Sequence, residues 1–148
     1  MAIRFFSDGI AFRLRHQRKI SQWLQTVAFR ENKTSGNLTY VFVSERRILE
    51  LNRQFLCHND YTDIITFDDS TEKEISGEMY VCIDTVRKNA ERYHTGFENE
   101  LLRVMVHGIL HLCGYNDKTE QEQQSMRAKE NDSLLLLSDN SVFPDQWE

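Results

Sequence analysis

Residues 104–117 read Val-Met-Val-His-Gly-Ile-Leu-His-Leu-Cys-Gly-Tyr-Asn-Asp, and the rest of the chain can be interpreted around this stretch. Apolar residues recur at helical spacing within it and just before it, at Leu101, Leu102, Met105, Ile109 and Leu112. On an α-helix, residues four positions apart lie on one face, about 6 Å apart along the axis. His107 and His111 therefore direct their imidazole rings toward one point.

A helix stop and a carboxylate follow this histidine pair. Because glycine adopts at little cost the left-handed conformation that ends a helix, we expect the chain to reverse at Gly114. The reversal would bring the Asp117 carboxylate over the two histidines. Two histidines and a carboxylate leave a fourth position for water, as in catalytic zinc sites, whereas structural sites use four protein ligands. The residues therefore predict a zinc-type metal site formed by His107, His111 and Asp117.

Other interpretations of this stretch are less favoured. The two histidines could be ordinary helix residues with hydrogen-bonded side chains, but the apolar flanks, the glycine and the carboxylate favour a metal site. A metalloprotease helix would carry glutamate directly after the first histidine, and position 108 is glycine. Cys113 points about 200° around the helix from His111, so it is left out of the site. Glu100 is either a hydrogen-bond acceptor for His107 or an ordinary first-turn glutamate.

Strand and helix patterns alternate in mixed order along the chain. We expect strands at 2–6, 38–43, 63–67 and 77–83, and further helices ending near Glu31, Phe55, Tyr93 and Leu137. Residues 33–37 have the composition of a turn, and Asp84 is placed to cap the helix at 85–93. This order predicts an α+β fold, with a small mixed β-sheet covered by helices and the metal site on a central helix and the turn after it.

The length and composition are those of a globular protein. At 148 residues we expect one domain, 1–148, with a loose C-terminal tail at about 138–148. No apolar run is long enough to span a bilayer, and the N-terminus lacks the pattern of a secretory signal. Three scattered cysteines fit a reducing compartment, and no glycine-rich phosphate loop is present. We expect a cytoplasmic protein with no membrane partner and no nucleotide cofactor.

The charge is unevenly distributed along the chain. A net charge of −5 opposes nonspecific binding of nucleic acid, yet residues 1–55 hold ten Lys or Arg against four Asp or Glu. Arg46, Arg47 and Arg53 lie off the apolar face of the helix expected at 44–55. They are our candidates for RNA phosphate contacts, and the alternative is that they are solvated surface residues.

Four stretches follow the patterns of one known family. Residues 107–117 align without a gap to His-Gly-x-Leu-His-Leu-x-Gly-Tyr-Asp-His. Residues 52–56 and 62–67 are similar to Asn-x-x-Tyr-Arg and Thr-Asp-Val-Leu-Ser-Phe, and residues 77–83 to a segment with Gly-Asp-Ile. In order and spacing, these stretches resemble the YbeY family of metal-dependent endoribonucleases.

The resemblance implies a function. It implies a single-strand-specific, metal-dependent endoribonuclease involved in 16S rRNA 3′-end maturation and ribosome quality control, with single-stranded rRNA and the ribosome as partners. The chain departs from the family at Asn116, usually aspartate, at Asp117, usually the third histidine ligand, and at Leu56, usually arginine. Leucine at position 56 weakens the case for an RNA contact there. A carboxylate in place of a neutral imidazole lowers the positive charge of the site, so we expect its preference to shift from Zn²⁺ toward harder ions such as Mn²⁺.

Two alternatives stay open at this point. The same ligands would serve a metallohydrolase of another substrate class, such as a peptidase. They would also serve a non-catalytic, ribosome-associated binding factor with a structural metal. No catalytic group is identifiable beyond metal-bound water, since the Asn116 side chain cannot accept a proton.

Overall fold

A computed structural model of the chain describes residues 3–56 and 62–139. Its elements in order are β1 (Arg4–Ser7), α1 (Gln17–Arg30), β2 (Thr34–Val43), α2 (Glu45–Leu56), β3 (Ile64–Asp68), β4 (Glu74–Cys82), α3 (Ile83–Arg92), α4 (Phe97–Leu112) and α5 (Glu120–Asp139). The strands form one sheet in the order β1-β2-β4-β3. Strands β1, β2 and β4 run parallel, and β3 pairs antiparallel to β4. The predicted α+β class with a small mixed sheet is confirmed.

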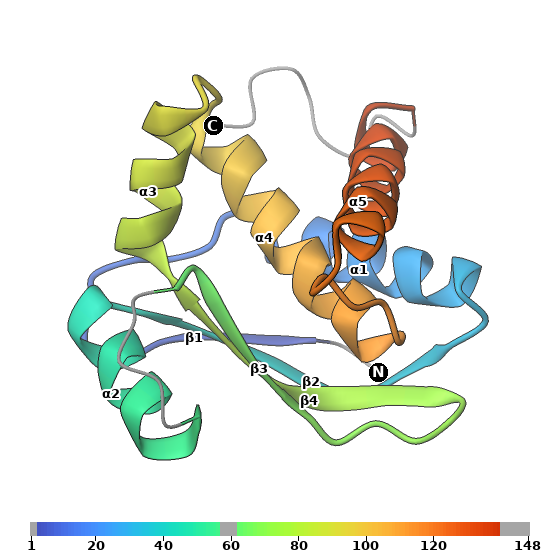
Figure 1. Ribbon diagram of the computed structural model, residues 1–148, viewed down its shortest axis with the longest axis horizontal. Coiled ribbons are helices and arrows are strands. Elements are labelled where there is room, and N and C mark those ends of the chain that lie inside the picture. Colours follow the sequence, from blue (N-terminus) through green and yellow to red (C-terminus); the bar gives the residue numbers. More distant parts are fainter. Residues whose placement is uncertain (1–2, 57–61, 140–148) are drawn as a thin grey trace.

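Helices cover both faces of this sheet unequally. Helices α1, α3, α4 and α5 gather on one face, and α2 lies on the other (Figure 1). The alternation of side chains along β2 explains the division, because neighbouring residues of a strand point to opposite faces. Phe42 packs into the large core under α4, whereas Val43 packs with Ile48 and Leu51 of α2.

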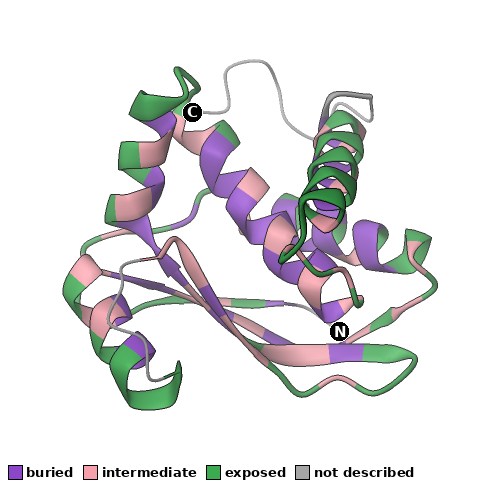
Figure 2. Ribbon diagram, viewed as in Figure 1, coloured by how far each residue is buried: buried purple, intermediate pink, exposed green. Residues whose placement is uncertain are grey.

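Helix α4 is the central element of the large core. It is buried along most of its length and lies between α3 and α5 (Figure 2). Its apolar residues leave almost no surface exposed, as the exposed fractions of Met105 and Ile109, both 0%, illustrate. The predicted metal helix is therefore held in the core, while Arg103, His107 and His111 form a half-buried stripe along it.

Strand β2 begins earlier than expected. The turn predicted at 33–37 is largely the first part of β2, with an irregular register between Ser35 and Leu38. A Cβ atom at Gly36 would lie 2.2 Å from the Ser76 hydroxyl oxygen, so a larger residue there would have to displace side chains of β4. The Ser-Gly-Asn composition thus marks a β-bulge rather than a turn.

The first turns of α2 and α3 differ in how their side chains bind backbone N–H groups. The Ser44 side chain accepts the Arg47 N–H at 3.2 Å, as a cap of α2 should. Asp84, expected to cap α3, lies instead inside its first turn, and its carboxylate accepts the Glu45 N–H of α2 at 3.2 Å. Asp84 therefore ties the start of α2 to α3.

The C-terminal helix α5 runs through Asp139, slightly past the predicted start of the tail at 138. The remainder of that tail lies outside the described residues. Within the part of the chain that the structure describes, no helix combines the length and apolar character needed to cross a membrane.

Candidate metal centre

The predicted reversal after α4 is present and has a defined geometry. The Gly114 N–H donates to the His111 carbonyl at 3.0 Å, and the Tyr115 N–H donates to the Leu110 carbonyl at 3.0 Å. This pair of bonds is the Schellman motif, which requires a left-handed residue, and Gly114 has φ of 108°. The loop is thereby turned back along the end of α4.

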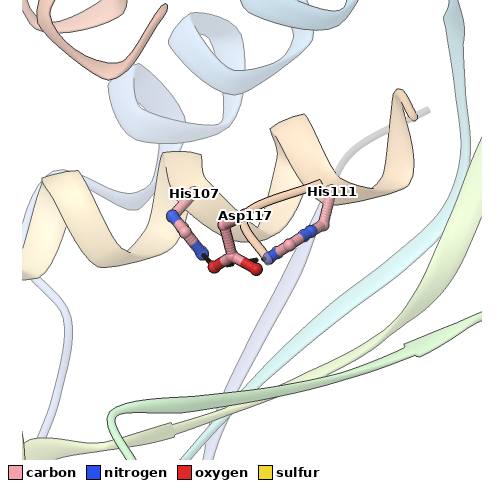
Figure 3. A group of neighbouring side chains, drawn as sticks. All are labelled: His107, His111 and Asp117. Carbon is pink, nitrogen blue, oxygen red and sulfur yellow. Dashed lines mark ion pairs between the residues drawn. The ribbon is translucent and has the colours of Figure 1, made fainter. Parts of the chain in front are cut away.

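The turn brings the three predicted ligands together (Figure 3). The Asp117 Oδ2 atom lies 3.3 Å from His107 Nε2 and 3.5 Å from His111 Nε2. One donor atom from each residue lies within 4.8 Å of the other two, and all three side chains are half-buried. The two nitrogens and one oxygen face a common point, so the residues present fit a divalent metal ion.

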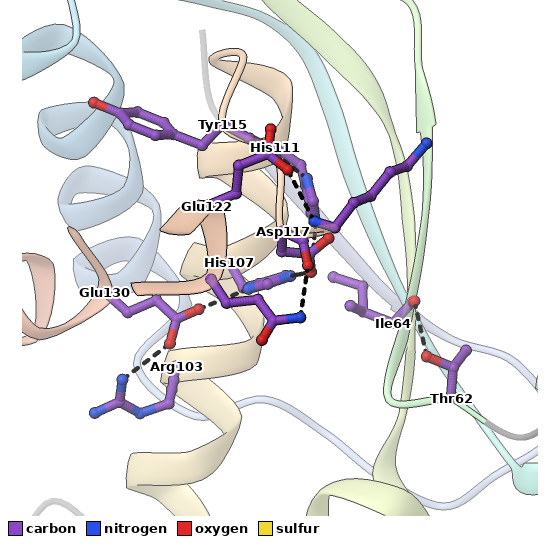
Figure 4. Close-up of polar contacts among 11 residues, drawn as sticks. Thr62, Ile64, Arg103, His107, His111, Tyr115, Asp117, Glu122 and Glu130 are labelled. Carbon is purple, nitrogen blue, oxygen red and sulfur yellow. Dashed lines mark hydrogen bonds and ion pairs between the residues drawn. The ribbon is translucent and has the colours of Figure 1, made fainter. Parts of the chain in front are cut away.

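Hydrogen bonds orient both imidazole rings for this purpose. The Nδ1–H of His111 donates to the Tyr115 carbonyl at 2.8 Å, and the Nδ1–H of His107 donates to Glu130 Oε2 at 2.6 Å (Figure 4). A carbonyl or a carboxylate can only accept, so each ring carries its proton on Nδ1. The Nε2 atoms are left free to bind a metal.

Glu130 is the functional residue that the sequence analysis missed. Glu100, which was considered as a hydrogen-bond acceptor for His107, is buried in α4. The His107 ring donates instead to Glu130 of α5. A sequence signal did exist: Glu130 falls on the buried face of α5 with Met126, Ser133 and Leu137, at helical spacing. A carboxylate on the apolar stripe of a helix needs a partner inside the protein.

The acidic surroundings of His107 shift its protonation. Burial lowers the pKa of His107, but the hydrogen bond to Glu130 and the charges of Glu130, Asp63 and Asp117 outweigh it and hold this pKa above its ordinary value. Burial raises the pKa of Glu130, but its bonds to His107 and Arg103 outweigh burial and lower this pKa. In the metal-free protein, each group of this pair therefore favours the charged form of the other.

Two further carboxyl groups near this pair have raised pKa values, in contrast to Glu130. Burial raises the pKa of Asp63, at the start of β3, and also that of Glu100 in α4. The sequence analysis did not single out Asp63, whose approach to His107 depends on how β3 packs on α4.

The glycine between the histidines is needed for packing. A Cβ atom at Gly108 would lie 2.7 Å from Met79 Sδ and 2.9 Å from Ile64 Cδ1, so α4 is pressed directly against β4 and β3 there. The side chain of Ile64 points toward the histidines from β3 (Figure 4). No space exists at this position for the glutamate of a metalloprotease helix.

The loop that carries Asp117 is held to its neighbours by a small network. The Tyr115 hydroxyl donates to Glu31 Oε1 at 2.7 Å, and Lys129 Nζ donates to Glu31 Oε2 at 3.0 Å. Burial raises the pKa of Glu31, but these two hydrogen bonds and the Lys129 charge outweigh it and lower this pKa. Helices α1 and α5 are thus both fastened to the turn that presents the His111 acceptor.

A cleft opens beside the cluster. It has a volume of about 700 Å³ and is lined by His107, Asp117, Glu120, Gln123, Gln124, Met126, Arg127, Ala128, Glu130 and Asn131. Apart from the first two, all of these residues belong to α5. Any metal at the cluster would therefore border a cleft of the size that protein ligands usually occupy.

The remaining predicted residues are not brought into this cluster. Arg46, Arg47 and Arg53 lie on α2, across the sheet from α4, and Arg47 Nε is 3.7 Å from Asp8 Oδ2. Leu56 ends α2 with 42% of its surface exposed. Cys113 is outside the ligand group, as expected. Burial raises the pKa of its thiol to about 11, which keeps the thiol protonated near neutral pH.

Comparisons with known proteins agree with this geometry. The family model described as "Endoribonuclease YbeY" matches residues 6–138. The chain belongs to the YbeY family. Among its relatives, the "Endoribonuclease YbeY" of Parabacteroides distasonis is 44% identical over 137 residues, covering 93% of this chain and 96% of that protein.

A second curated relative and a solved structure agree with this assignment. The "Endoribonuclease YbeY" of Cytophaga hutchinsonii is 46% identical over 135 residues, covering 90% of this chain and 94% of that protein. The solution structure of TM1509 from Thermotoga maritima superposes with a TM-score of 0.61 at 29% identity, and covers 99% of both chains. The resemblance found in four short motifs therefore extends over nearly the whole chain.

Proposed function

We propose that this chain is a single-strand-specific, metal-dependent endoribonuclease that acts in 16S rRNA 3′-end maturation and ribosome quality control in the cytoplasm. As a YbeY family member that covers nearly the full length of relatives named as endoribonucleases, it is an endoribonuclease, a hydrolase acting on phosphodiester bonds. The observation that carries the metal-dependent part is the convergence of His107, His111 and Asp117 within 4.8 Å.

The proposed cofactor is one divalent ion, Zn²⁺ or Mn²⁺, held by these three residues. When bound, such an ion polarises a phosphoryl oxygen and lowers the pKa of a water molecule, as phosphodiester cleavage requires. The chain prepares the site by fixing the tautomer of each histidine through Glu130 and the Tyr115 carbonyl. The Asp117 carboxylate adds a hard oxygen donor, which favours Mn²⁺ more than a third imidazole would.

The cleft on α5 is the proposed place for RNA next to the scissile phosphate. Its amide side chains, Gln123, Gln124 and Asn131, have the donors and acceptors that hydrogen-bond to base edges. Arg127 provides a positive charge for a phosphate. Bases are accessible in this way when they are unstacked, which supports a preference for single-stranded RNA.

RNA cleavage with matched metal analysis tests this function. We expect the metal-loaded protein to cut a single-stranded RNA and to cut the same sequence in a duplex far more slowly. His111→Ala removes a metal donor, so it should lose bound metal and lower cleavage at least about 100-fold. His94→Asn is the control, because His94 is exposed, lies outside the cluster and has φ of 56°, which asparagine tolerates.

The same experiment separates the alternatives. Equal RNA cleavage by the wild type and His111→Ala would contradict the proposal, and so would cleavage of peptides but not RNA. A binding factor with a structural metal would bind RNA or ribosomes without cutting. It would also keep its role in ribosome maturation when Asp117→Ala removes the metal.

A further inference from the structure

The contact between Glu130 and His107 is the most unusual feature of the molecule around the proposed centre. Glu130 is only 6% exposed, whereas Glu120, Arg127 and Asp132 of the same helix are exposed. Its Oε2 atom accepts the His107 Nδ1–H at 2.6 Å, and its Oε1 atom accepts Arg103 Nη1–H at 2.9 Å. Both carboxylate oxygens are thus engaged by α4, 23 and 27 residues away in sequence.

A fold-stabilising role alone does not account for this arrangement. Burying a carboxylate and a guanidinium removes both from water, and well-packed apolar residues often stabilise a protein as much. The neighbouring positions on the same stripe of α5, Met126 and Leu137, are apolar and pack into the core. The charged group is found only where the stripe passes the proposed metal ligand.

The geometry gives the carboxylate a specific effect on His107. It holds the ring in the tautomer with the proton on Nδ1 and keeps Nε2 directed at Asp117 Oδ2, 3.3 Å away. A charged acceptor also makes the imidazole a stronger donor to a metal. The second ring, His111, has only the neutral Tyr115 carbonyl as its acceptor. The two histidines are therefore not equivalent.

Arg103 holds the carboxylate in place. Its Nη1–H donates to Glu130, and its Nη2–H donates to Asn131 Oδ1 at 2.9 Å, so the guanidinium bridges consecutive residues of α5. Its charge also offsets part of the negative charge of the Glu130 carboxylate beside His107.

We propose that Glu130, braced by Arg103, is a positioning residue that sets the metal affinity of the centre through His107. The inference rests on the proposed function in that it assumes the three-residue cluster binds a metal. It adds that a helix supplying no direct ligand, α5, controls how tightly the metal is held.

Metal affinity in the full chain tests the inference. The Zn²⁺ dissociation constant is measured by competition with a chelator for the wild type, Glu130→Gln and Glu120→Gln. Glutamine keeps the size of the side chain and removes its charge, and we expect the Glu130 variant to bind Zn²⁺ about 10–100-fold more weakly. Glu120→Gln is the matched control, because Glu120 borders the same cleft and is exposed. Its affinity should change less than about threefold.

A second readout does not depend on metal. Nitrogen NMR of the metal-free protein at a pH where His107 is neutral should show one tautomer for its ring in the wild type and a mixture in Glu130→Gln. If Glu130→Gln does not fold, Arg103→Gln leaves the carboxylate in place without its brace and should weaken Zn²⁺ binding by a smaller factor.

The possible failures are distinguishable. Zn²⁺ affinity in Glu130→Gln within about twofold of wild type, or an unchanged tautomer of His107, would overturn the role of Glu130. A wild type that binds Zn²⁺ but cuts no RNA would overturn the proposed function and leave this inference intact. A wild type that binds no divalent metal would overturn both.

Discussion

Asp117 determines the chemical character of the proposed centre, because it is the only ligand that brings a negative charge. Two imidazoles and a carboxylate form a harder donor set than three imidazoles. We expect Asp117→His to raise the affinity for Zn²⁺ relative to Mn²⁺ by about tenfold or more. Competition titrations of both ions against one chelator measure this ratio. An unchanged ratio would mean that Asp117 does not bind the metal.

The pair of His107 and Glu130 should make the stability of the metal-free protein depend on pH. The raised pKa of His107 gives a contribution that is complete below about pH 6.5 and is lost as pH rises through that raised pKa. The lowered pKa of Glu130 gives one that is present above about pH 4.5 and is lost as pH falls through the lowered pKa.

In the presence of a chelator, the free energy of unfolding should therefore fall as pH rises above about 6.5 and through the raised pKa of His107. Urea unfolding measures it, with Glu130→Gln as the comparison. The difference between the two proteins should shrink as pH rises. A difference that is independent of pH would show that the pair does not titrate as described.

The convergence of His107, His111 and Asp117 was predictable from sequence, and the hydrogen bond from His107 to Glu130 was not. Spacing on a helix fixes the direction of His107 and His111, and Gly114 marks the reversal that returns Asp117. Such rules are local. Glu130 reaches His107 only after α5 has packed on α4, and Glu100, nearer in sequence, was the residue considered.

Among the elements, α4 packs closely on the sheet at Gly108, where a Cβ atom would lie 2.7 Å from Met79 Sδ and 2.9 Å from Ile64 Cδ1. Gly108→Glu would recreate the His-Glu-x-x-His pattern of metalloproteases. We expect it to destabilise the protein by about 3 kcal/mol or more, since a carboxylate would be forced between Met79 and Ile64 without a partner. No peptidase activity should appear.

Gln121→Glu is the matched control, because it adds the same charge to an exposed position of α5. Its effect on the free energy of unfolding should stay within about 0.5 kcal/mol. Similar stability of the two variants in urea would contradict the close packing of α4 on β3 and β4.

Element types were predicted better than element boundaries. Strands β3 and β4 were expected from their apolar runs at 63–67 and 77–83, and both are present and pair with each other. The start of β2 was wrong, because Ser35 and Gly36 resemble a turn in composition while their pairing partners lie in β4. Composition reports local preference, and the close approach at Gly36 is set by the partner strand.

For the whole molecule, the division of the sheet into two faces separates the metal cluster from the arginines of α2. If RNA contacts both, it must pass around the sheet. We expect Ala at Arg46, Arg47 and Arg53 to weaken binding of single-stranded RNA and to reduce the salt dependence of log K by up to about 2, at about 0.7 per phosphate contact. Binding titrations at several salt concentrations measure this.

Ala at Arg13, Arg15 and Arg18 gives the control, with the same change in net charge near the start of α1. A loss confined to the α2 variant would support local phosphate contacts. Equal losses in both variants would contradict the assignment of RNA contacts to α2, because total charge alone would explain them.

The central claim is that the reversal at Gly114 returns Asp117 to the paired histidines of α4 and so completes a metal site. X-ray absorption at the zinc edge of the zinc-loaded protein tests it most directly. The account predicts two imidazole nitrogens and a carboxylate oxygen at about 2.0–2.2 Å, with the carboxylate lost in Asp117→Ala. A sulfur neighbour at about 2.3 Å, or a zinc ion with fewer than two imidazoles, would contradict it.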